Sequence, residues 1–260
     1  VFLVIMVQKS VYKISSMRQE TPDTVSFVLS GAAIEFLCGQ FVMIHYPLEL
    51  AGKHGASEKD LAEGKPVKRA YSIASSSVRG LKGEIELCVK AMPDGWISKL
   101  LQEVKLGQVL EVSGPFGRFT FDPLKDKDIV MLAAGSGIAP MHAMIEQICL
   151  GDHKDVKGHL IFSNKVESDI IYRKVFDKFA CDNSNVKISN TLTRCADGSS
   201  WDGSEGRINF KMLSEICGDS LVSESKVFFI CGPSVFVKSM RECLEELGVS
   251  KENVRFESYG

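Results

Sequence analysis

The sequence predicts a two-domain α+β protein, in which an antiparallel β-barrel precedes an α/β domain built on a parallel sheet. The first 122 residues contain short apolar or alternating runs separated by turn residues, a pattern that favours an antiparallel barrel or sandwich. Beyond Asp122-Pro123, apolar runs alternate with helical patterns, which is typical of a parallel sheet covered on both faces. A chain of 260 residues has room for two domains. We therefore expect domains at 1–122 and 123–260.

The strands of the first half follow from local patterns. Apolar and polar residues alternate over 84–89, and shorter apolar runs predict strands at 25–29, 41–45 and 109–112. The polar, glycine-bearing stretch 49–68 is expected to be an exposed loop between two strands, and only 97–104 has a helical pattern. The seven apolar residues 1–7 are too few to span a bilayer, and they predict a strand unless they are a remnant upstream of a start at Met6.

The second half alternates between strands and helices in a regular order. Buried-type strands are predicted at 129–134, 159–163, 186–192, 227–231 and 254–257. Helices are predicted between them at 141–150, 172–179, 210–216 and 235–247.

Composition and charge exclude several classes of function. The chain has 31 basic and 33 acidic residues, and a net charge of −2 gives no electrostatic footprint for nucleic acid. Its eight cysteines include no Cys-x-x-Cys pair, and most fall in apolar runs. We therefore expect reduced, core-filling thiols in a cytoplasmic protein, without a zinc site or an iron–sulfur cluster and without a membrane span.

One segment of the first half combines a cation with an aromatic ring and a hydroxyl group: Arg69-Ala70-Tyr71-Ser72. On a strand, Arg69 and Tyr71 point to one face and Ser72 to the other. The guanidinium could bind phosphate oxygens, but the same tetrapeptide would suit an ordinary amphipathic strand.

Two later features of the first half could also serve a ligand. The segment 94–98, Asp-Gly-Trp-Ile-Ser, predicts a helix start with unpaired N–H groups that favour an anion, although a simple capped helix would look alike. The glycine-rich corner 114–119 could close a barrel without touching any ligand.

The second half carries two glycine-bearing turns at the ends of strands. Gly135-Ser136-Gly137 leads into a helix, and such a turn lets a pyrophosphate approach the backbone, although a generic strand–turn–helix joint would read the same way. Pro140 stands where a dinucleotide fingerprint needs its third glycine, so this is not that fingerprint. Cys231-Gly232-Pro233 follows the fourth strand, where ligands collect in parallel sheets; the alternative is a buried structural cysteine.

In order and spacing, these segments resemble the motifs of the ferredoxin–NADP reductase superfamily, from about Val11 to Tyr259. The resemblance implies an FAD-containing oxidoreductase in which NAD(P)H reduces the flavin in a groove between barrel and sheet. Some members of the superfamily hold FMN, so the inference of FAD depends on the Gly-x-x-Ser helix start. It implies catalytic roles for Ser72, Cys231 and Glu257. It implies cofactor binding by Arg69, Ala70, Tyr71, Ser72, Leu87, Val89, Gly95, Trp96, Ile97, Ser98, Gly135, Gly137, Ile138, Thr193, Arg194, Gly232, Pro233 and Tyr259.

The segments 163–165 and Thr193-Arg194, with Arg207 further on, are expected at the adenosine end of the dinucleotide. The cations slightly favour NADPH over NADH, although Arg194 could equally hold the pyrophosphate.

The expected function is hydride transfer from NAD(P)H to bound FAD, with electrons passing to an external acceptor such as a ferredoxin-like, haem or flavin carrier. Two alternatives stay open: a non-catalytic module that binds the cofactors, and an electron-transfer subunit of a larger complex.

Overall fold

The computed structural model describes residues 8–46, 67–92, 98, 101, 104–195, 200–218, 222–223 and 225–259. Contacts between Cα atoms divide the chain into two compact units, Val1–Thr120 and Phe121–Gly260. The expected strand at 1–7 and nearly all of the loop at 49–68 lie outside the described residues.

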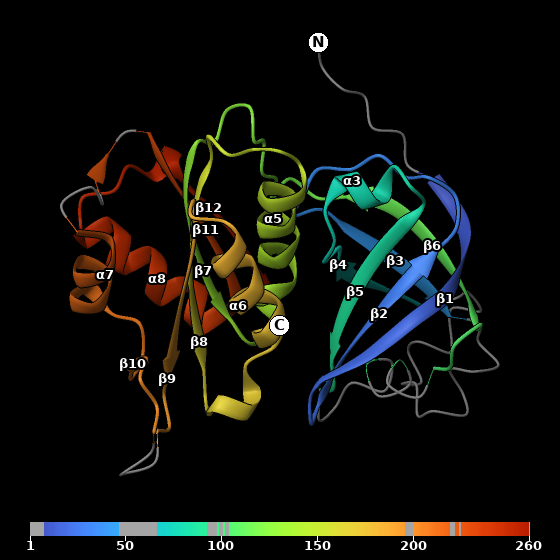
Figure 1. Cartoon of the computed structure of the whole chain (residues 1–260), viewed down its shortest axis with the longest axis horizontal. Coiled ribbons are helices and arrows are strands. Elements are labelled where there is room, and N and C mark those ends of the chain that lie inside the picture. The colour runs from blue at the N-terminus through green and yellow to red at the C-terminus, as the bar shows by residue number, and fades with distance from the viewer. Residues whose placement is uncertain are drawn as a thin grey trace. The chain divides into compact units, whose positions relative to one another are not determined.

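The first unit is a six-stranded antiparallel sheet in the order β4-β3-β6-β1-β2-β5 (Figure 1). A bridge between Ile73 and Leu87, with the Ala74 N–H donating to the Glu86 carbonyl, joins the two outer strands and closes the sheet into a barrel. The strands are β1 (Gln8–Thr21), β2 (Thr24–Ser30), β3 (Phe41–Tyr46), β4 (Val67–Ser72), β5 (Glu84–Lys90) and β6 (Val109–Phe116).

Two elements of the barrel differ from the sequence prediction. The longest strand, β1, was not predicted because β-bulges at Ile14/Ser16 and Gln19/Thr21 interrupt its alternation of apolar and polar residues. The helix α3 (Ser77–Gly80) contradicts the expectation of a single helix at 97–104, since four residues are too few to display a helical period. Of that predicted helix, Ser98, Leu101 and Val104 are described; Ser98 and Leu101 are helical, and Val104 is not.

The second unit is a parallel sheet in the order β10-β9-β8-β7-β11-β12. Helices α5 and α6 cover one face, and α7 and α8 cover the other (Figure 1). The strands are β7 (Asp128–Ala134), β8 (Lys157–Asn164), β9 (Val186–Leu192), β10 (Ser204–Glu205), β11 (Lys226–Pro233) and β12 (Val254–Tyr259). The helices are α5 (Ile138–Leu150), α6 (Arg173–Asp182), α7 (Phe210–Cys217) and α8 (Ser234–Glu246). Among these strands and α-helices of the described residues, β10 was not predicted.

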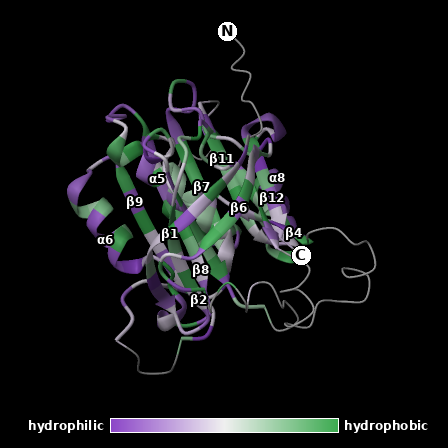
Figure 2. Ribbon diagram, turned by 90° about the vertical axis from the view of Figure 1, so that its right-hand side faces the viewer, coloured by the Kyte–Doolittle hydropathy of each residue, from purple (hydrophilic) through white to green (hydrophobic). Residues whose placement is uncertain are grey.

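The apolar patterns place the core of each unit. In Figure 2 the apolar colour runs along strands of both sheets, while α6 carries many hydrophilic residues. One buried cluster fills the barrel, and another joins the parallel sheet to α7 and α8. Burial of this apolar surface contributes roughly 25 cal/mol per Å² to folding.

An ion pair anchors the C-terminal strand of the sheet. Arg255 on β12 donates two hydrogen bonds to Asp126, at 2.6 and 2.8 Å, and the Asp126 side chain is only 3% exposed. A paired, bidentate contact of this kind compensates the burial of a carboxylate. The position of β12, which carries Glu257 and Tyr259, is thereby fixed relative to β7.

Two further findings concern the cysteines and the helices. All eight cysteines are free thiols, but only Cys38, Cys88 and Cys231 are buried, and Cys181 is exposed. The expectation of core-filling thiols was therefore wrong for the exposed Cys181, whereas Cys217 and Cys243 are half-buried and pack against the core of the second unit. Among the described helices, none is long and apolar enough to cross a membrane.

Candidate cofactor-binding sites

The Arg-Ala-Tyr-Ser segment lies on β4, which pairs with β3 at one side. Tyr71 is opposite Val42 and Arg69 is opposite Ile44, so both side chains share the face on which β3 places its buried residues. Tyr71 packs against the barrel core, whereas Arg69 is exposed. This arrangement leaves a cation at the surface beside a half-buried aromatic ring.

The remaining residues of the segment follow the alternation. Ala70 is exposed, and Ser72 is 8% exposed at the end of β4. On β5, the side chains of Leu87 and Val89 are buried, so these residues could meet a ligand only through main-chain atoms. The bridge at Ile73 and Leu87 is isolated, and β4 and β5 are not paired as a continuous ladder beyond it.

The predicted pyrophosphate-binding helix start is described only in part. Gly95, Trp96 and Ile97 lie outside the described residues. Ser98 is buried, and its Oγ accepts a hydrogen bond from the Met92 N–H at 3.0 Å. The described residues nevertheless suit a flavin with a phosphate group, since Arg69 offers charge, Tyr71 a flat ring and Ser72 a hydroxyl group.

The turn after β7 requires glycine for a steric reason. Gly135–Gly137 form a 3₁₀ turn that continues into α5, beginning at the buried Ile138. A Cβ atom at Gly137 would lie 2.2 Å from the Cys231 carbonyl oxygen, so only glycine fits there. Gly135 has φ +55° and would carry a Cβ into open space. The turn therefore packs its backbone against the end of β11 and leaves the N-terminus of α5 beside it, which suits a pyrophosphate.

The ends of β11 and β12 bring four predicted residues together in two pairs. Cys231 is opposite Glu257 and Pro233 is opposite Tyr259 in the parallel register. The Tyr259 hydroxyl hydrogen-bonds to the Cys231 sulfur, and burial raises the pKa of this thiol to about 12, with Glu257 adding to the shift. Cys231 is therefore a neutral thiol, which suits an apolar contact better than a nucleophile. Gly232 is buried and Pro233 is exposed.

Glu257 supplies the carboxylate of this cluster. Burial raises its pKa, and its Oε2 atom has no hydrogen-bond partner among the described residues. Buried carboxylate oxygens are normally hydrogen-bonded, so the unpartnered Oε2 atom makes Glu257 a candidate for contact with a ligand. The amide or hydroxyl groups of a nucleotide would fit that position.

We predict that Glu257→Gln raises the thermal unfolding midpoint at neutral pH. Because burial raises the pKa of Glu257 in the folded state, the charged form is disfavoured there, and wild-type stability falls as pH rises through the folded pKa. The gain from glutamine should be present at neutral pH and should vanish well below the ordinary value of 4.5, where the carboxyl group is protonated in both states. Thermal scans across pH measure it, with the exposed Glu252→Gln as control; a gain that persists unchanged in acid contradicts the prediction.

The ends of β8 and β9 form the predicted adenosine side. The Thr193 N–H and hydroxyl both donate to the Asn164 carbonyl, and the Arg194 N–H donates to the Lys165 carbonyl at 2.8 Å. The side chains of Arg194 and Lys165 are exposed, whereas Asn164 is 6% exposed and its Nδ2 atom has no hydrogen-bond partner among the described residues. A buried donor beside two cations suits the acceptor oxygens of a nucleotide.

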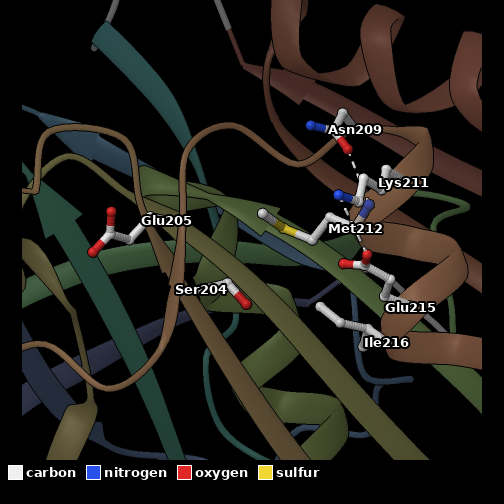
Figure 3. Close-up of a pocket in the computed structure, with 7 residues that line it drawn as sticks. All are labelled: Ser204, Glu205, Asn209, Lys211, Met212, Glu215 and Ile216. Atoms are coloured by element: carbon white, nitrogen blue, oxygen red, sulfur yellow. Dashed lines mark hydrogen bonds and ion pairs between the residues drawn. The ribbon is translucent and has the colours of Figure 1, made fainter.

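Two pockets on the second unit lie away from the predicted site residues. A pocket of about 310 Å³ is lined by Ser204 and Glu205 of β10 and by Met212 and Ile216 of α7. In Figure 3 the Glu205 carboxylate points away from α7. A larger pocket of about 560 Å³ lies between α6 and β9 and includes Trp201. Neither is lined by any predicted site residue, so the candidate site rests on side-chain placement.

Sequence reasoning missed one residue near the flavin motif. Tyr46 ends β3, and its buried phenol lies within the electrostatic reach of Arg69 and Tyr71. The alternation of β3 was the available signal, since Val42, Ile44 and Tyr46 share one face.

Two family models match the chain, one in each unit. An oxidoreductase FAD-binding domain matches residues 12–121, and an oxidoreductase NAD-binding domain matches residues 131–242. The FAD and NAD(P) cofactors that the motifs imply are thus those of the matched families.

Known proteins of similar sequence and structure agree with these matches. NADH-cytochrome b5 reductase 1 of Mortierella alpina is 32% identical over 73% of this chain and 62% of its own length. The protein of the same name from Eremothecium gossypii is 31% identical over 77% of this chain and 69% of its own length. The solved CS-b5R domains of human Ncb5or, in the NAD⁺ form, have 25% identity and a TM-score of 0.77 over 98% of this chain and 70% of that one.

The alignment spans less than two thirds of the Mortierella protein, 62%, so it concerns the shared domains and not the whole relative. Both predicted folds, the antiparallel barrel and the parallel sheet with helices, are confirmed. By its two matched domains and its relatives, this chain belongs to the ferredoxin–NADP reductase superfamily of FAD- and NAD-binding oxidoreductases.

Proposed function

We propose that this chain is an NAD(P)H-dependent flavoprotein reductase that passes electrons to an external acceptor, with a haem protein favoured over a ferredoxin-like or free flavin carrier. Bound FAD would supply the redox chemistry, by accepting a hydride from the nicotinamide and releasing electrons to the acceptor. The haem preference is supported by relatives that are named cytochrome b5 reductases.

The observation that carries this proposal is the cluster of Cys231, Glu257 and Tyr259 at the carboxyl ends of neighbouring parallel strands. Ligands of parallel sheets collect at that edge. The neutral Cys231 thiol offers a compact apolar contact for a nicotinamide ring, and Glu257 offers an acceptor for its carboxamide N–H groups. These residues would bind and orient the ring, and no proton needs to pass through them.

The barrel residues would hold the second cofactor. Arg69 would neutralise the flavin phosphates, Tyr71 would lie against the ring system, and Ser72 would present its hydroxyl group to the reactive edge of the ring. These roles come from the family resemblance and from the placement of the side chains on β4.

An anaerobic absorption spectrum tests the proposal. Purified protein supplied with FAD should show a bound-flavin spectrum that bleaches on addition of NADPH or NADH, and cytochrome b5 should then restore the oxidised spectrum. Protein that binds FAD but is not bleached by either nucleotide would be a binding module. Bleached protein that reduces ferricyanide but not cytochrome b5 would contradict the haem preference alone.

We further propose that NADPH is preferred to NADH, in contrast to the relatives, which are named NADH-cytochrome b5 reductases. The support is the pair of cations Lys165 and Arg194, which follow adjacent strand ends joined by the main-chain hydrogen bond from Arg194 to Lys165, and the buried Asn164, which precedes Lys165. A 2′-phosphate on the adenosine ribose would meet two cations there, whereas the hydroxyl group of NADH would not use their charge.

We predict that Arg194→Ala raises the KM for NADPH by roughly 10- to 100-fold, because a charged hydrogen bond contributes about 1.5–3 kcal/mol. The KM for NADH should change little, and steady-state kinetics with both nucleotides measure the difference. Lys187→Ala, which removes an exposed cation from the amino end of the same strand, is the control. An equal loss with both nucleotides would assign Arg194 to the pyrophosphate instead.

A further inference from the structure

Tyr46 stands at the inner face of the barrel, diagonally across from Arg69. In the register of β3 and β4, Tyr46 is opposite Val67, Ile44 opposite Arg69 and Val42 opposite Tyr71. Directly opposed residues of antiparallel strands share a face, and diagonal neighbours lie about 7–8 Å apart, within reach of long side chains. Tyr46 and Tyr71 therefore flank Arg69 on one face of the strand pair.

The three side chains differ in depth. Tyr46 is 2% exposed, Tyr71 is half-buried and Arg69 is exposed. Burial raises the pKa of both phenols; Tyr71 adds to the shift at Tyr46, and the charge of Arg69 opposes it. Both phenols therefore stay protonated, and each can donate a hydrogen bond within this cluster or to a ligand bound beside Arg69.

A second buried tyrosine of the same barrel, Tyr12, can be compared with Tyr46. Tyr12 is as deeply buried as Tyr46, and its hydroxyl donates to the Ala32 carbonyl at 2.8 Å, which is a structural role inside the barrel. The phenol of Tyr46 lies within the electrostatic influence of Arg69 and Tyr71, the two residues of β4 that the flavin motif singles out.

From this placement we propose that Tyr46 is a positioning residue of the flavin site, which acts on the phosphate-bearing side chain of the cofactor together with Arg69. This inference rests on the proposed function. Tyr46 shares with Arg69 the task of holding the flavin phosphates, while the ring system is held by other residues.

A double-mutant cycle tests the proposal. The affinities of wild type, Tyr46→Phe, Arg69→Ala and the double variant for FAD and for riboflavin are measured by fluorescence quenching. Tyr46→Phe should weaken FAD binding about 5- to 10-fold, the loss expected for one hydrogen bond. In the Arg69→Ala background the same substitution should have little further effect, because residues that act on one group are not additive.

Riboflavin, which lacks the phosphates, separates this role from a structural one. Tyr46→Phe should leave riboflavin affinity and the thermal midpoint of the flavin-free protein unchanged, and Tyr12→Phe should leave the FAD-to-riboflavin affinity ratio unchanged. Equal losses for FAD and riboflavin, an unchanged FAD affinity, or losses that multiply in the double variant each overturn the role of Tyr46. Wild-type protein that takes up no flavin overturns the proposed function itself.

Discussion

Arg69→Ala is expected to purify without flavin and to bind added FAD about 100-fold or more weakly than wild type. The guanidinium is exposed on β4 beside the half-buried Tyr71, where it can reach phosphate oxygens. Each charged hydrogen bond that is lost costs about 1.5–3 kcal/mol, and a forked contact makes two. The flavin-to-protein ratio after gel filtration measures retention, and titration with FAD measures affinity.

Arg69→Lys is the matched variant, because it keeps the charge but loses the fork, and it should fall between wild type and alanine. Riboflavin affinity should differ little among the three proteins, since riboflavin carries no phosphate. If Arg69→Ala stays fully yellow after gel filtration, the phosphate-binding assignment of Arg69 is wrong.

The parallel-sheet unit was largely predictable from its sequence because its strands are buried on both faces. Val186–Leu192 was predicted with the bounds that the structure has, and the other four long strands were predicted to within three residues at each end. Continuous apolar runs between helical patterns leave little ambiguity. The barrel was harder, because the bulges of β1 break its alternation and the apolar Val11 is exposed on this strand.

The candidate sites could be predicted from the sequence only in part. The motif residues could be chosen from the sequence, but the contact of Cys231 with Glu257 and Tyr259 depends on the register of β11 and β12, which no local pattern specifies. The unpartnered side-chain atoms of Glu257 and Asn164 depend on burial in the folded unit. Tyr46 was missed because only the pairing register of β3 and β4 places it diagonally across from Arg69, and that register is not visible in the sequence.

Gly137→Ala should impair reduction by NADPH while flavin binding is kept. The new Cβ atom would lie 2.2 Å from the Cys231 carbonyl oxygen and 2.6 Å from the Gly232 nitrogen, so the turn or the end of β11 must shift. Overpacking against a rigid backbone costs about 1–3 kcal/mol. Because the displaced atoms belong to both the predicted pyrophosphate turn and the predicted nicotinamide contact, we expect a loss of roughly 10- to 100-fold in the second-order rate constant for flavin reduction.

Gly135→Ala separates this steric effect from the conformational one. Gly135 has φ +55°, so alanine costs about 1–2 kcal/mol of backbone strain, but its Cβ would meet no atom within 4 Å. Anaerobic stopped-flow mixing with NADPH should therefore show a smaller loss for Gly135→Ala than for Gly137→Ala, with both proteins retaining FAD. If the flavin of Gly137→Ala is reduced as fast as that of wild type, the end of β11 can shift without affecting nucleotide binding. The close approach of Gly137 to Cys231 then has no part in that binding.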